Sequence, residues 1–183
     1  MDWNLTKEAV EGQVTNVLNT CRTVKKLMEA MREAGCEVGR DYFKVVKCDT
    51  QTGGGFSIQH GVVLCYNQLQ TNADVQSTMV HELLHAYDYC RNPNMDFADC
   101  KQHACSEIRA ANLSGDCDMA QEFLRGHVQT LSPFSWAGMK ERCVRRRAAL
   151  SVAMNPRCGG REGAAKVVDG MYEKCMEDCA PFT

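Results

Sequence analysis

The chain has 183 residues, of which 44% are hydrophobic and 24% charged, a composition ordinary for a soluble globular protein with a sizeable core. Its formal net charge of −2 lacks the broad basic excess of a general nucleic-acid binder, so we expect no nucleic-acid partner. No apolar run approaches the roughly 20 residues of a membrane span. The N-terminal residues show neither a secretory nor a matrix-targeting pattern.

The first third of the chain predicts a helix followed by a small sheet. Apolar residues recur at helical spacing between residues 6 and 34, which predicts one long amphipathic helix that Gly35 caps. A β-type run follows at residues 42–46, and the glycines at 53–55 are expected to break the chain. Residues 56–66 then supply a second or third strand. The residues of the helical stripe are Val10, Val14, Val17, Cys21, Val24, Met28 and Met31.

A second helix is predicted over residues 71–91, where no Pro or Gly interrupts an apolar stripe at intervals of three and four. It contains His81-Glu82-Leu83-Leu84-His85, an H-E-x-x-H pattern. A spacing of four puts both imidazoles on one face of the helix, where they can bind one zinc ion, and Glu82 can act as the catalytic base. The residues of the stripe are Val75, Met79, Leu83 and Ala86.

The rest of the chain is predicted to be mostly helical, with helices over residues 101–112, 119–131, 138–154 and 161–179. Ser132-Pro133 is expected to close the second of these helices. The basic run at residues 145–147 is interpreted as a solvated helix face. We find no linker or internal repeat, and we predict a single α+β domain over residues 1–183. In it, a small sheet lies beside the metal-binding helix, a zincin-like arrangement in which an edge strand can hold an extended peptide.

The twelve cysteines are far more than cytosolic proteins use, and their even number predicts a disulfide framework. Structural zinc sites or a redox carrier are the alternatives, but no two cysteines are spaced as C-x-x-C. Many disulfides without a secretory signal fit the mitochondrial intermembrane space, where proteins are oxidised on import.

Two histidines leave a zinc ion short of one protein ligand. In a metzincin the third ligand lies six residues after the second histidine, but Arg91 stands there and has no lone pair to donate. Asp88 is about 10 Å along the helix axis from His81 and cannot share the ion with it. The next predicted helix offers Glu107, as in gluzincins, and His103 as the alternative ligand or a transition-state group.

Two segments, HELLHAYDYCR at 81–91 and ACSEIRAANLSGDC at 104–117, resemble the family of mitochondrial inner-membrane proteases that double as ATP synthase assembly factors. In this resemblance His81 and His85 match the zinc ligands and Glu82 the catalytic glutamate. It covers the chain from about Cys21 onward. Shorter matches lie at residues 27–31, 54–56, 63–65, 143–148 and 180–182.

The resemblance implies a disulfide-stabilised zinc metalloendopeptidase of the intermembrane space, peripheral to the inner membrane. It implies two roles: cleaving the N-terminal propeptide of ATP synthase subunit 6 (subunit a), and helping inner-membrane assembly factors to place that subunit in the Fo sector. The alternative is a protease-independent assembly chaperone whose zinc site is vestigial or structural. Sequence leaves open which side chain steadies the oxyanion: His103, His127, Arg109 or Tyr87.

Overall fold

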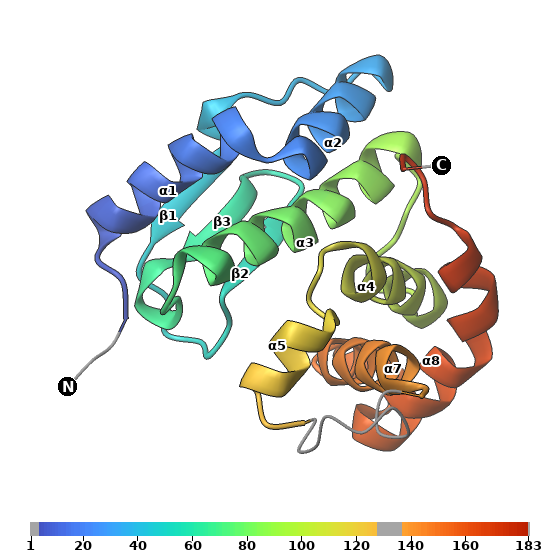
Figure 1. The fold of residues 1–183 in the computed structure, drawn as a ribbon. Helices are drawn as coiled ribbons and strands as arrows, with labels where there is room; N and C mark the ends of the chain where they lie inside the picture. The colour runs from blue at the N-terminus through green and yellow to red at the C-terminus, as the bar shows by residue number, and fades with distance from the viewer. Residues whose placement is uncertain (1–3, 128–136, 183) are drawn as a thin grey trace. The chain divides into compact units, whose positions relative to one another are not determined.

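The computed structural model describes residues 4–127 and 137–182 and has an α+β fold. Its backbone contacts group into two compact units, residues 1–93 with Phe182 and residues 94–181. Figure 1 shows the elements of each unit. The single domain predicted over residues 1–183 stays a prediction, and the two units are described separately.

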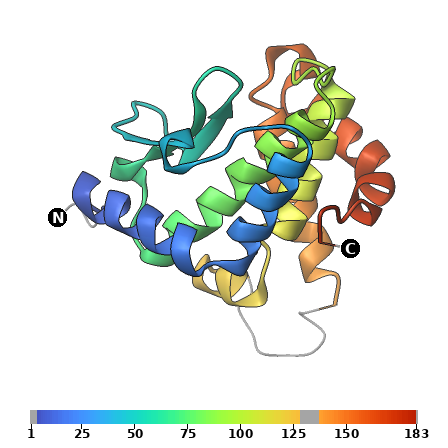
Figure 2. The same ribbon diagram turned by 90° about the horizontal axis from the view of Figure 1, so that it is seen from above.

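The first unit contains a three-stranded mixed sheet, with strands β1 (Phe43–Val46), β2 (Gly54–Ser57) and β3 (Gly61–Cys65). Their order is β1-β3-β2, with β1 parallel and β2 antiparallel to β3. Helices α1 (Lys7–Thr20), α2 (Arg22–Glu33) and α3 (Asn72–Arg91) lie on one face of this sheet (Figures 1 and 2). Buried and exposed residues alternate along β1 because its other face is open to solvent.

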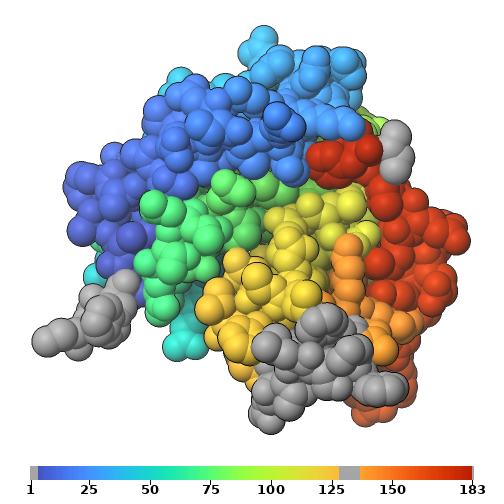
Figure 3. Space-filling model, viewed as in Figure 1, coloured from blue at the N-terminus to red at the C-terminus, as the bar shows by residue number. Residues whose placement is uncertain are grey.

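The long helix predicted over residues 6–34 is wrong, because the chain breaks at Cys21 into α1 and α2. Cys21 has an extended backbone with φ −78° and ψ 113°. Its N–H still bonds the carbonyl of Val17, and the chain then begins a new helix. Both helices pack against α3, and their side chains lie beside those of α3 in Figure 3. Gly35 ends α2 in the left-handed region with φ +87°, as predicted.

The glycines at 53–55 do not simply break the chain, because Gly54 and Gly55 belong to strand β2. A Cβ on Gly54 would lie 2.6 Å from the carbonyl oxygen of Val63 and 2.7 Å from Cγ2 of Thr78 in α3. Glycine at this position therefore lets the strand approach the helix closely. The predicted segment 56–66 is also divided, since the β2–β3 hairpin turns within it.

The helix predicted over residues 71–91 is confirmed as α3. Its N-terminus is a capping box, in which Thr71 Oγ1 accepts from the N–H of Asp74 and the Asp74 carboxylate accepts from the N–H of Thr71. All four residues of the predicted stripe are buried. The motif therefore lies on a helix whose start and orientation are well defined.

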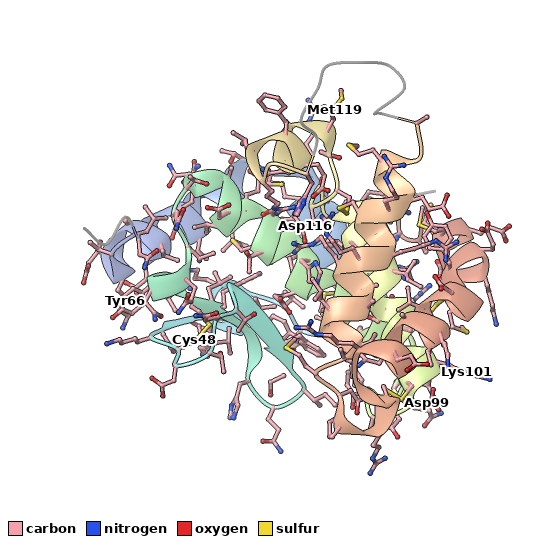
Figure 4. The ribbon with its side chains drawn as sticks, turned by 90° about the horizontal axis from the view of Figure 1, so that it is seen from below. Cys48, Tyr66, Asp99, Lys101, Asp116 and Met119 are labelled. Atoms are coloured by element: carbon pink, nitrogen blue, oxygen red, sulfur yellow. A yellow bond between two sulfur atoms is a disulfide. The ribbon has the colours of Figure 1, made fainter. Side chains whose placement is uncertain are left out.

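The second unit is helical, with α4 (Cys100–Leu113), α5 (Met119–Leu124), α7 (Met139–Val152) and α8 (Gly160–Glu177). Asp99 caps α4 by accepting from the N–H groups of Lys101 and Gln102, and Asp99 and Lys101 are labelled in Figure 4. Helices α4, α7 and α8 contact one another around a core of small and aliphatic side chains. That core includes Ala104, Ile108, Ala111, Val144, Ala148, Val152, Ala164 and Val168.

The helix predicted over residues 119–131 is too long. Helix α5 ends at Leu124, and Gly126 follows in the left-handed region with φ +73°. Gly126 was the sequence signal for this end. Residues 128–136, with the predicted Ser132-Pro133 stop, lie outside the described residues.

Five disulfides confirm the predicted framework, and the thiols of Cys21 and Cys179 are free. Three of the bonds hold α4 and the residues that follow it against the other helices of the second unit. The five bonds are Cys36–Cys90 and Cys48–Cys65 in the first unit, and Cys100–Cys158, Cys105–Cys175 and Cys117–Cys143 in the second.

The basic run on α7 is not merely a solvated face, because each arginine has an acidic partner. Arg145 pairs with Glu141 and Asp169 and lies over the ring of Tyr172, 3.7 Å from its centroid. The other two arginines reach buried carboxylates: Arg146 donates to Glu122 at 2.8 Å and Arg147 to Asp116 at 2.9 Å. Asp116 is labelled in Figure 4.

No helix among the described residues is long and apolar enough to cross a membrane.

Candidate metal centre

Helix α3 brings the two motif histidines together. The ring centroids of His81 and His85 lie 4.9 Å apart with the ring planes at 75°. His85 is buried, with 6% of its surface exposed, while His81 is partly exposed. Their four-residue spacing places both rings on one face of the helix, and imidazole nitrogens on one face can bind a single divalent ion.

Glu82 lies beside the edge strand of the sheet. It is 8% exposed, and a Cβ on Gly54 in β2 would come 3.5 Å from its Cγ. Strand β2 pairs with β3 on one side only within the described sheet. The catalytic candidate and a strand edge that can pair with a peptide therefore lie next to each other in the first unit.

Asp88 and Tyr87 are buried near the end of the same helix. The Asp88 carboxylate lies 3.0 Å from the guanidinium of Arg91, which also covers the Tyr87 ring at 5.3 Å from its centroid. Asp88 thus shares an ion pair with Arg91, the residue at the metzincin ligand position. This contact gives Asp88 a structural role near the end of α3.

Glu107 and His103 lie one turn apart on α4, in the second unit. Glu107 is 6% exposed, and its Oε1 accepts from Ser151 Oγ at 2.5 Å and lies 3.3 Å from His103 Nε2. The other ring nitrogen of His103, Nδ1, is buried and has no hydrogen-bond partner among the described residues. A proton on Nε2 therefore suits the contact with Glu107 and leaves a lone pair on Nδ1.

Arg109 and His127 are two of the candidates to stabilise the oxyanion. Arg109 is 1% exposed. It binds the C-terminal segment through the carboxylate and carbonyl of Asp178 and through the carbonyl of Ala180. These contacts tie Arg109 to the C-terminal segment. His127 is exposed at the end of the described residues.

Sequence reasoning missed Ser151. The hydroxyl that contacts Glu107 comes from α7, 44 residues later in the chain. A lone serine in a helix carries no local signal for such a contact.

An H-E-x-x-H helix beside a small sheet edge is the arrangement of the zincin class of metal-dependent peptidases. The chain belongs to the Peptidase M76 family, whose model matches residues 8–183. No solved structure shows significant similarity to it.

Three curated relatives are named mitochondrial inner membrane protease ATP23, the human one as an ATP23 homolog. The chain is 38% identical over 172 residues to the homolog from Homo sapiens, covering 93% of this chain and 67% of the relative. It is 38% identical over 156 residues to the protein from Lodderomyces elongisporus, covering 85% and 62%. The protein from Saccharomyces cerevisiae is 38% identical over 164 residues, covering 87% and 71%. The chain thus spans about two thirds of the length of these relatives.

Proposed function

We propose that this protein is a zinc-dependent metalloendopeptidase. The observation that carries the proposal is the His81–His85 pair on one face of α3, with Glu82 next to it beside the edge strand β2. Two imidazoles and one carboxylate are a ligand set that suits Zn²⁺ and leaves a coordination position for the reaction. Bound there, zinc would lower the pKa of a water molecule to near 7 and polarise the scissile carbonyl.

Glu82 carries the proton transfers in this mechanism. Its carboxylate takes a proton from the attacking water and passes it to the leaving amine, a role worth roughly 10²- to 10⁴-fold in rate for a positioned general base. The open edge of β2 supports an endopeptidase, because an extended substrate can add to it as a further strand and be held by main-chain hydrogen bonds.

We propose Glu107 as the third zinc ligand. Its carboxylate is buried and oriented by two neighbours, and α4 is cross-linked at Cys100 and Cys105. These features hold a carboxylate in one place, as a ligand must be held. His103 is the alternative ligand, supported by its buried Nδ1 without a partner.

Zinc content distinguishes these two ligands. Glu107→Ala should lose zinc on dialysis against a weak chelator, as measured by atomic absorption. His103→Ala removes a group that orients Glu107 and not a ligand, so it should keep most of its zinc under the same conditions. Stoichiometric zinc in Glu107→Ala together with loss from His103→Ala would assign the site to three histidines instead.

For the substrate, we propose the precursor of ATP synthase subunit 6 (subunit a), whose N-terminal propeptide would be removed. We further propose that the protein assists inner-membrane assembly factors in placing subunit 6 in the Fo sector. The resemblance of residues 81–91 and 104–117 supports both roles, as does the name shared by the relatives, mitochondrial inner membrane protease.

The proposed location is the mitochondrial intermembrane space, with peripheral association to the inner membrane. Five disulfides support a compartment that oxidises thiols. The names of the relatives support the membrane association.

Processing and assembly can be tested separately in mitochondria that lack their own relative of this protein. These mitochondria are given either the wild-type protein or its Glu82→Gln variant. We expect the wild type to process subunit 6 and support ATP synthase assembly, whereas Glu82→Gln supports assembly without processing. Assembly lost along with processing would mean that the two roles are one activity. Processing by neither form, with assembly by both, would favour the chaperone with a vestigial or structural zinc site.

A further inference from the structure

Ser151 is the partner that α7 supplies to the Glu107 carboxylate. Its hydroxyl lies 2.5 Å from Glu107 Oε1. Because an ionised carboxylate can only accept hydrogen bonds, the serine O–H is the donor. Both residues belong to the second unit, where α4 and α7 contact each other.

Residues next to Ser151 on α7 belong to the apolar core, and its hydroxyl donates to Glu107 there. Ala148, three residues earlier, and Val152, the next residue, are both fully buried in the core shared with α4. An alanine at 151 would suit such an interface, but it would leave a buried carboxylate with one donor fewer. Buried charged groups need hydrogen-bond partners.

Two contacts meet at the same oxygen of Glu107. Ser151 Oγ approaches Oε1 from α7, and His103 Nε2 lies 3.3 Å from Oε1 within α4. Donors from two helices fix the rotation of the carboxylate in a way that one contact would not. Groups that orient a metal ligand in this manner affect metal affinity without touching the metal.

We propose that Ser151 is a positioning residue for zinc binding, acting through the Glu107 carboxylate. This inference rests on the proposed role of Glu107 as third ligand. Loss of a residue that orients a ligand typically weakens metal binding by about 10- to 100-fold. A hydroxyl that only ties α4 to α7 would change the stability of the fold and leave zinc affinity unchanged.

The test compares Ser151→Thr with Ser151→Val, because these two side chains have nearly the same shape and differ in the hydroxyl. Zinc affinity is measured by competition with a chromophoric chelator, and the melting temperature of each variant is measured with and without zinc. Ser114→Ala is the matched control, since it removes a serine hydroxyl at the end of α4 that accepts from Asp116 N–H. Glu107→Ala is measured alongside.

We expect Ser151→Thr to bind zinc within about threefold of the wild type and Ser151→Val to bind it about 10- to 100-fold more weakly. Zinc should then raise the melting temperature of Ser151→Val less than that of the wild type, while Ser114→Ala keeps the full rise. Equal zinc affinity of the Thr and Val variants, with zinc lost from Glu107→Ala, would overturn the role of Ser151 and leave the ligand in place. Zinc retained by Glu107→Ala would instead overturn the ligand, and the role of Ser151 with it.

Discussion

The disulfide Cys105–Cys175 is expected to contribute strongly to the stability of the helix that carries Glu107. Cys105 lies two residues before Glu107 on α4, and its partner on α8 is 70 residues away in sequence. Because Cys100–Cys158 stays bonded when this disulfide is removed, the loop that Cys105–Cys175 closes runs only over residues 100–105 and 158–175. In the chain-entropy account, closing a loop of roughly 22 residues stabilises the fold by about 3.4 kcal/mol at 25 °C. Cys117–Cys143 closes a loop of similar length, with a separation of 26, and should contribute about 3.5 kcal/mol.

The double variants Cys105→Ala/Cys175→Ala and Cys117→Ala/Cys143→Ala test these values by urea unfolding of the zinc-free proteins. Removing either bond should lower the free energy of unfolding by a similar amount, about 3.5 kcal/mol. Removing Cys105–Cys175 should weaken zinc binding more, because it frees the segment next to Glu107. A loss of stability that is larger for one pair by more than about 1 kcal/mol would refute the reasoning from loop length.

Three other predictions follow from the described contacts. Gly54→Ala should destabilise the protein by about 1–3 kcal/mol because the new Cβ overpacks against Val63 and Thr78. Gly55→Ala should leave the stability unchanged, because a Cβ at residue 55 would meet open space. Thermal unfolding of both variants tests this difference. Thr71→Ala should cost about 1 kcal/mol by removing the capping box of α3, and an unchanged melting temperature would contradict this. Mass spectrometry after alkylation should find at most two labelled cysteines, Cys21 and Cys179, in native protein and twelve after reduction. Labelling of most cysteines without reductant would contradict the framework.

Local patterns were enough to predict the helix of the candidate site. Residues 71–91 combine a cap, an unbroken apolar stripe and a metal-ligand spacing, and each of these depends only on neighbours within a few turns. The same holds for the helix predicted over residues 101–112, which the structure shows as α4 with Ala104, Ile108 and Ala111 in the core of the second unit.

Features that depend on distant parts of the chain could not be predicted. The apolar stripe of residues 6–34 continues through Cys21, and no proline or glycine stands between residues 13 and 34. The break at Cys21 accompanies the packing of both helices on α3. From local sequence, Gly54 predicts only a break in the chain. The structure shows that residue 54 must be glycine because Val63 and Thr78 leave no room for a Cβ.

The second unit shows the same limit. From the sequence alone, Arg146 and Arg147 are part of a basic run on a solvated helix face. Their partners Glu122 and Asp116 lie 24 and 31 residues earlier in the chain, so local sequence does not reveal these pairs. The pairing of the cysteines is equally non-local, since an even count predicts disulfides but does not select partners.

The most direct measurement of the central claim is the cleavage of a subunit 6 precursor peptide by purified wild type and by purified Glu82→Gln, with zinc content determined on the same samples. The account predicts that both proteins bind one zinc ion. It also predicts that the wild type cleaves, stops when chelated and recovers on zinc addition, whereas Glu82→Gln cleaves at least 100-fold more slowly, the order expected for loss of a general base. Undiminished cleavage by zinc-loaded Glu82→Gln would contradict it.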